Sequence, residues 1–355
     1  MGGPELQPST SADVRVGLMR CGLAALLFGL SAPAAARLTD ELGAFQLAGL
    51  LYLGAALAVA PVVTRRPPSR RALRTSGRGL ATAVVLGGAV GPVFLAAGLG
   101  RLDAGTASLL LNLELVFTTV VAATIFREHL GRTIVSGTVL VSAGAVMLGW
   151  SGQPEVRWGA ALLAAACLCW AIDNSVTASL DQIAPSHITA AKGVIAGATN
   201  LGIGIALSGI PPFGSTLAAL AVGAVGYGAS ITLWVSGARL LGAARGQLIF
   251  ATAPFIGAIA AWTVFAAPIS GTEVVAALLA AAGVALVLRS THEHDHTHEP
   301  LDHDHDHTHD DHHDHDHHDH DHESSVTGRH SHPHRHRHMA HAHGHVPDLH
   351  HRHDH

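Results

Sequence analysis

Ten apolar stretches, each near the length of about 20 residues that crosses a bilayer as a helix, fill most of the first 290 residues of this chain. In lipid every backbone polar group needs a partner inside its own helix or barrel, so this pattern favours a bundle of spanning helices. The sequence therefore predicts an all-α, polytopic membrane protein with ten transmembrane helices, at 15–35, 42–63, 79–99, 105–126, 133–150, 158–178, 188–209, 216–238, 244–266 and 272–289.

Charged residues are scarce and unevenly placed. They make up 13% of the chain, whereas a soluble domain carries about a quarter. Of 26 acidic residues, 15 follow Ser290, as do 27 of the 29 histidines. This division excludes a soluble enzyme as the main body. Neither a phosphate-binding loop nor a nucleophile–base pair is legible in the spans, so we expect no enzymatic activity and no nucleic-acid partner.

The connection at 64–78, TRRPPSRRALRTSGR, carries six arginines, and the positive-inside rule places such a segment in the cytoplasm. With ten spans both termini are then cytoplasmic. Arg supplies 20 of the 21 basic residues and Ala and Gly are abundant, a composition that indicates the coding bias of a bacterial genome with high GC content. We therefore expect the protein in the inner membrane of a bacterium. A cleavable signal peptide is the alternative for the first span, since Arg15 and Arg20 precede an apolar run and SAPAAA.

An internal repeat argues against that cleavage. A shift of 139 positions superposes 98–133, GLGRLDAGTASLLLNLELVFTTVVAATIFREHLGRT, on 237–272, GARLLGAARGQLIFATAPFIGAIAAWTVFAAPISGT. The predicted organisation is a segment at 1–14, five-span repeats at 15–150 and 151–290, and a tail at 291–355. Five is odd, so the second repeat enters the membrane from the opposite side, as in many secondary transporters.

The spans resemble the EamA-type members of the drug/metabolite transporter superfamily over about residues 15–290. The resemblance rests on APF around Pro254, on NLELVFTTVVAATIFREHL with Glu128 at the family's acidic position, and on CWAIDNSVTASL followed by KGVIAGATNL. Ala267 departs from it, because the family's second repeat usually has its own Glu there. The resemblance implies a ten-helix carrier of small solutes, with the bilayer and a small solute as partners. Small-residue helix faces also allow a homodimer.

Six polar side chains inside the spans are candidates for binding solute or a coupling ion. An ionisable group at membrane depth costs at least about 2.5 kcal/mol, so each needs an explanation. Residues four apart share a helix face, so Asp173 lies on a polar face of the sixth span and Lys192 on one of the seventh. If these two faces meet, Asp173 and Lys192 form an ion pair. The alternatives are structural hydrogen bonds, or a Lys192 that extends to the membrane surface. The candidates are Glu114, Asn112, Asp173, Asn174, Lys192 and Asn200.

The tail at 291–355 alternates His with Asp and predicts a disordered segment, because it has too few apolar residues to form a core. Imidazole and carboxylate together suit divalent zinc, nickel or cobalt, although the spans require no cofactor. The alternative is a solvated run that buffers protons. The candidate metal ligands are His292, His294, His296, His303, His305, His307, His312, His313, His315, His317, His318, His320 and His322.

These observations predict a secondary-active exporter of a small solute that works by alternating access and carries a metal-binding tail. Two alternatives stay open: a carrier that exports a divalent transition metal, and a membrane-anchored metal store or sensor.

Overall fold

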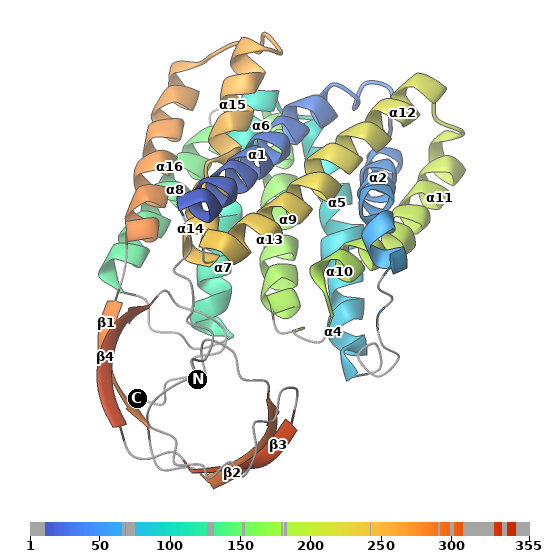
Figure 1. The fold of residues 1–355 in the computed structure, drawn as a ribbon. Coiled ribbons are helices and arrows are strands. Elements are labelled where there is room, and N and C mark those ends of the chain that lie inside the picture. Colours follow the sequence, from blue (N-terminus) through green and yellow to red (C-terminus); the bar gives the residue numbers. More distant parts are fainter. Residues whose placement is uncertain are drawn as a thin grey trace. The chain divides into compact units, whose positions relative to one another are not determined.

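The computed structural model describes residues 11–65, 68, 75–125, 131–150, 153–178, 180, 183–241, 243–289, 292–298, 302–307, 330–335 and 339–345. Residues 11–289 form a bundle of helices packed side by side (Figure 1). The first half contains α1 (Ser11–Ala36), α2 (Ala44–Arg65), α4 (Gly77–Thr82), the π-helical segment η1 (Ala83–Val90), α5 (Gly91–Leu99), α6 (Ala104–Leu110), α7 (Leu113–Thr124) and α8 (Arg132–Trp150).

The second half follows the same order, except that a π-helical segment divides the span that corresponds to α2. It contains α9 (Pro154–Ala178), α10 (Pro185–Ala191), the π-helical η2 (Lys192–Ala196), α11 (Gly197–Ser208), α12 (Phe213–Val222), the π-helical η3 (Gly223–Ala229), α13 (Ser230–Leu241), α14 (Ala243–Phe250), α15 (Ala253–Thr263) and α16 (Gly271–Arg289).

Nine helices in the described part of the chain are long and apolar enough to span a membrane. They coincide with nine of the ten predicted spans. The remaining prediction, 244–266, falls on α14 and α15, whose apolar stretch Leu248–Thr263 is shorter. Large apolar side chains such as Leu207 and Leu278 are exposed around the bundle, as expected where lipid replaces water. The prediction of an all-α polytopic membrane protein is confirmed.

Helix packing is the same in the two halves. α1 packs against α13 and α15, while its counterpart α9 packs against α5 and α7. The 139-residue shift carries α5 onto α13 and α7 onto α15. The related helices α8 and α16 also pack together. Each repeat therefore makes equivalent contacts with the other, and its odd number of crossings gives the second repeat the opposite orientation.

Irregular backbone also recurs at equivalent positions. The π-helical segments η1 and η3 are related by the same shift, and so are the breaks after α6 and α14. In the second break Pro254 cannot donate a backbone hydrogen bond, so α15 starts afresh there. The first break has no proline. Its turn is tightened by hydrogen bonds from a backbone amide to the carbonyl oxygen three residues earlier, as from Asn112 N to Leu109 O at 3.2 Å.

Glycines let the helices of the two halves approach closely. Gly49 of α2 faces α11, and a methyl group placed on it would lie 2.5 Å from the backbone nitrogen of Leu201. Gly193 of η2 faces α2 in the same way, with a methyl group 2.5 Å from the carbonyl oxygen of Tyr52. Small residues thus bring α2 against the seventh span at backbone contact, the packing mode usual between membrane helices.

Four segments of the tail are β-strands: β1 (His292–His298), β2 (Asp302–His307), β3 (His330–Arg335) and β4 (Met339–His345). β1 pairs with β4 and β2 with β3, both antiparallel. Disorder of the tail at 291–355 as a whole stays a prediction. Like charges directly opposite each other destabilise a strand pair, and the acid-rich β1 and β2 pair here with the acid-free β4 and β3. The candidate ligands His312 to His322 lie outside the described residues.

Candidate functional site

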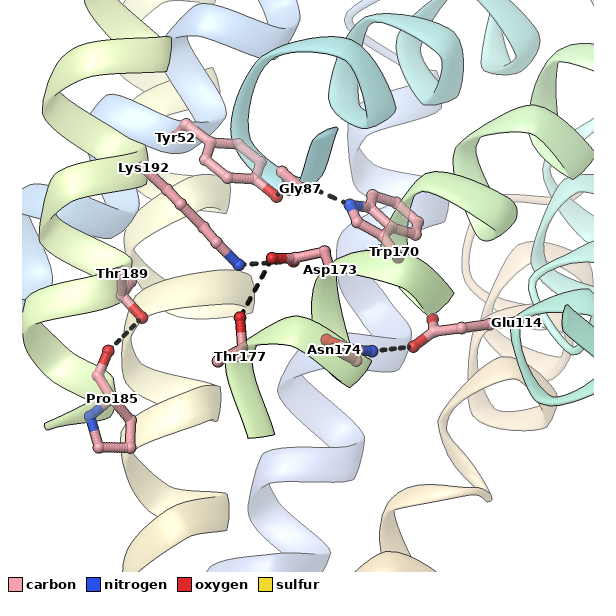
Figure 2. Close-up of polar contacts among 10 residues, drawn as sticks. All are labelled: Tyr52, Gly87, Glu114, Trp170, Asp173, Asn174, Thr177, Pro185, Thr189 and Lys192. Atoms are coloured by element: carbon pink, nitrogen blue, oxygen red, sulfur yellow. Dashed lines mark hydrogen bonds and ion pairs between the residues drawn. The ribbon is translucent and has the colours of Figure 1, made fainter. Parts of the chain in front are cut away.

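Polar side chains from four spans meet around the second half of α9 (Figure 2). Asp173 of α9 forms an ion pair with Lys192 at the start of η2, with 2.5 Å between Nζ and Oδ2. The hydroxyl of Thr177, one turn later, donates to Oδ1 of Asp173 over 3.2 Å. The two polar helix faces do meet as the residue spacing predicts. Both charges are sequestered, with side-chain exposures of 14% for Lys192 and 4% for Asp173.

The ion pair lies well inside the bundle. Asp173 is five residues before the end of α9 and Lys192 seven residues after the start of α10. At 1.5 Å per residue both lie about 8–10 Å along the helix axis from the end at which α9 and α10 are connected. In this structure Lys192 thus pairs with a carboxylate inside the bundle and does not extend to the membrane surface.

Gly87 makes room for this pair. Its missing side chain leaves space for the carboxylate of Asp173, because a methyl group at Gly87 would overlap the carboxylate atoms. The carbonyl oxygen of Gly87 accepts two hydrogen bonds, from the hydroxyl of Tyr52 at 2.5 Å and from Nε1 of Trp170 at 3.3 Å. Gly87 lies in η1, and single π-helical turns are frequent at functional sites. The third span thus joins the second and sixth spans at one backbone group.

Glu114 supplies the second acidic group of this region. Its Oε1 accepts a hydrogen bond of 2.7 Å from Nδ2 of Asn174, the residue after Asp173. Glu114 belongs to the first turn of α7, directly after the break in the fourth span, where the helix dipole favours a negative charge. Its side chain is half-buried and Asn174 is exposed. This arrangement can accept a proton or a cation in place of the amide hydrogen bond.

The side chains of the other two candidates, Asn112 and Asn200, donate hydrogen bonds to backbone carbonyl oxygens. Asn112 is buried at the break before α7, and its side-chain amide donates to Leu109 O over 2.9 Å. Asn200 of α11 donates to Ala89 O of η1 over 3.1 Å. Among the hydrogen bonds of the described residues, neither side chain reaches Glu114 or Asp173. Their positions suit residues that shape the irregular helices around the site.

Sequence reasoning missed Tyr52, Trp170 and Glu273. Tyr52 is one of two tyrosines in the chain, and a hydroxyl within a span was the available signal. Glu273 is buried at the start of α16, where it accepts hydrogen bonds from the backbone and side chain of Ser270 and from Thr106. Ser270 and Glu273 form a capping box, which the spacing SGTE encodes.

The structure gives no preassembled metal centre in the part of the chain whose side chains it describes, where no three His, Cys, Asp or Glu side chains are grouped to hold an ion. Glu128 and His129 lie outside the described residues.

Two repeats of broken and π-helical membrane spans around sequestered charges define a class of protein, the polytopic carriers built from repeated halves. The model of the EamA-like transporter family matches residues 16–150 and again residues 157–289. The chain belongs to this family of membrane transporters, as its resemblance implied.

Two individual proteins are similar to this chain. An uncharacterized transporter of Methanothermobacter thermautotrophicus is 29% identical over 205 residues, which cover 55% of this chain and 60% of that protein. The match thus spans about three fifths of the relative. A solved structure titled only as the crystal structure of a protein is 21% identical, with a TM-score of 0.55, and the match covers 78% of this chain and 97% of that one. At this identity the likeness shows the fold alone.

Proposed function

We propose that this protein is a secondary-active exporter that moves a small solute by alternating access between its two repeats. Family membership and the equivalent packing of the two halves support this mechanism, because such halves can exchange conformations around a fixed site. The observation that carries the proposal is the pair of polar contacts on α9, Asp173 with Lys192 and Asn174 with Glu114.

Glu114 and Asn174 bind the solute or the coupling ion in this proposal. Lys192 already neutralises Asp173 at 2.5 Å, whereas the side chain that hydrogen-bonds to Glu114 is the uncharged amide of Asn174. Glu114 can therefore give up its hydrogen bond to the Asn174 amide and bind a proton or a ligand more readily than Asp173 can give up Lys192. Its place beside the break in the fourth span supports this role, since broken helices line the sites of many inverted-repeat carriers.

The Asp173–Lys192 pair acts as a latch that closes one end of the bundle. It ties the sixth span to the seventh, and Gly87 ties the third span to the second and sixth close to it. The Arg-rich connection at 64–78 places this end in the cytoplasm by the positive-inside rule. The same rule puts both termini in the cytoplasm, and the Arg-dominated composition suits the inner membrane of a bacterium.

Flux measurements in vesicles test this function. Purified protein is reconstituted, and uptake of single amino acids and of zinc is measured for the wild type and for Glu114→Gln. The proposal expects at least one solute whose flux falls more than tenfold in the variant. The matched control is Glu155→Gln, which neutralises an exposed acid at the start of α9 and leaves flux unchanged. Equal flux for all three proteins above empty vesicles would reject the role of Glu114.

A second function concerns the tail, which we propose binds divalent zinc, nickel or cobalt. Its support is the density of imidazole and carboxylate groups after Ser290. Deletion of 291–355 separates the alternatives. A solute carrier keeps its flux without the tail. A metal store without transport loses metal binding and shows no flux in either form. A metal exporter moves zinc in the vesicle assay.

A further inference from the structure

The contact between Asp173 and Gly87 has a counterpart in the other half of the bundle. Helices α1 and α9 end 142 positions apart, and this shift carries Ser31 onto Asp173. The 139-residue shift carries Gly87 of η1 onto Gly226 of η3. A methyl group placed on Gly226 would lie 2.5 Å from Cβ of Ser31 and 3.3 Å from its hydroxyl oxygen. Gly226 thus makes room for Ser31 as Gly87 makes room for Asp173.

A second pair of contacts follows the same correspondence. A methyl group on Gly237 of α13 would lie 3.0 Å from the carbonyl oxygen of Gly17 in α1. A methyl group on Gly98 of α5 would lie 3.1 Å from the carbonyl oxygen of Gly159 in α9. The shifts of 142 and 139 positions relate these residues as well. The packing of α1 against the eighth span is therefore equivalent, at two separate points, to the packing of α9 against the third span.

The contacts at Ser31 and at Asp173 lie towards opposite ends of the bundle. Each of these residues is five positions before the end of its helix, which is about 8 Å along the helix axis. α1 and α9 are the first and sixth spans, so they cross the membrane in opposite directions. The positive-inside rule assigns the end near Asp173 to the cytoplasm and the end near Ser31 to the outer side. Each contact joins one repeat to the other.

Uncharged side chains form the contact on the outer side. Ser31 is buried, and its hydroxyl donates to the carbonyl oxygen of Phe28 over 2.6 Å. The side chain of Tyr227, the residue after Gly226, makes a polar contact with that of Ser31. The ring of Tyr227 also packs edge-on against Phe28, with 5.7 Å between the ring centroids. Separation of α1 from η3 therefore leaves none of these side chains with an unpaired charge.

A second contact joins the repeats at the same end of the bundle. Arg37 directly follows α1, and its guanidinium donates to the carbonyl oxygen of Phe265, in the connection between α15 and α16. The guanidinium also lies over the Phe265 ring, 5.7 Å from the ring centroid, which is within cation–π range. Arg37 belongs to the first repeat and Phe265 to the second. The outer end is thus held closed by two contacts between the repeats.

We propose that these contacts form an outer latch, which closes the end of the bundle opposite the Asp173–Lys192 pair. The inference rests on the proposed alternating access and adds the residues that part when the site around Glu114 opens to the outer side. In this scheme the two latches part in turn, one on each side of the site. The members of the outer latch are Ser31, Gly226, Tyr227, Arg37 and Phe265.

Thiol labelling of the full-length protein in right-side-out vesicles tests the outer latch. The three native cysteines are replaced by Ala, Asn174→Cys supplies the label position, and a membrane-impermeant reagent is applied from the outer side. Arg37→Gln removes the guanidinium that joins the repeats, and because Arg37 is exposed its substitution leaves the packing of the bundle intact. The matched control is Arg101→Gln, since Arg101 is exposed at the same end but donates to Ala97 O of its own repeat, over 2.6 Å.

A second variant acts on the buried part of the outer latch. Gly226→Ala places a methyl group against Ser31 and forces α1 away from η3. Its matched control is Gly22→Ala, because Gly22 also lies in the bundle, on α1, and has open space around it.

The inference expects Arg37→Gln and Gly226→Ala to be labelled from the outer side at least fivefold faster than their controls. A smaller increase in either variant that elutes as folded protein in detergent overturns the outer latch. Asp173→Asn, labelled from the cytoplasmic side, separates this inference from the proposed function. If it raises cytoplasmic labelling while the outer variants match their controls, alternating access stands without this latch. Absence of outer labelling in every variant would reject both.

Discussion

The substitution Asp173→Asn removes one charge of the ion pair and leaves Lys192 without its carboxylate partner. The pair has 2.5 Å between its charged atoms and side-chain exposures of 14% and 4%. Loss of one partner from a buried pair of this kind costs about 3–5 kcal/mol, since the remaining charge stays out of water. For a large domain a change of 1 kcal/mol lowers the melting temperature by about 2 °C, so we expect a decrease of about 6–10 °C.

The assay is thermal unfolding of the purified protein in detergent, followed by intrinsic fluorescence. Lys192→Met should lower the melting temperature to a similar extent, because it strands the carboxylate of Asp173. The double variant Asp173→Leu with Lys192→Met removes both charges and should unfold at a higher temperature than either single variant. The control Asp40→Asn changes an exposed acid in the first connection and should shift stability by less than about 0.5 kcal/mol.

This reasoning is refuted if the effects of the two single substitutions add in the double variant. Additivity would mean that the charges do not interact in the folded protein. Single variants as stable as the wild type would refute it equally, since they would show that neither charge depends on the other.

Two further predictions concern other parts of the molecule. Gly87→Ala introduces a methyl group into the space of the Asp173 carboxylate and should destabilise the bundle by about 1–3 kcal/mol, whereas Gly202→Ala, with open space around it, should be neutral or stabilising by up to about 1 kcal/mol. Unfolding curves compare the two, and equal stability would show that the space beside Gly87 is not filled. Deletion of 291–355 should leave solute flux within twofold of the wild type while it lowers bound zinc to background in equilibrium dialysis, and zinc retained by the deletion protein would place the metal in the spans.

Much of the bundle was predictable because membrane spans are encoded locally. Apolar runs fix where the helices lie, and the 139-residue repeat fixes how the halves correspond. The Asp173–Lys192 contact was predictable for a related reason. A short connection makes the sixth and seventh spans neighbours, and the four-residue spacing puts each charge on a polar face.

Other parts of the site depend on backbone irregularity that the sequence does not mark. Tyr52 and Trp170 converge on the carbonyl of Gly87 because η1 is π-helical there, and no residue pattern signals that turn. Pro254 indicates the break in the ninth span, but the equivalent break at Asn112 contains no proline that would indicate it. For the tail, local composition predicts only that it has no apolar core.

Accessibility of Asn174 from the two sides of the membrane tests alternating access most directly, and it requires no known solute. A single cysteine is introduced by Asn174→Cys after Cys21, Cys167 and Cys169 are replaced by Ala, and membrane-impermeant thiol reagents are applied to right-side-out and inside-out vesicles. The account predicts labelling from both sides, with labelling from the cytoplasmic side increased when Asp173→Asn opens the latch. Labelling that stays confined to one side in every variant would contradict it.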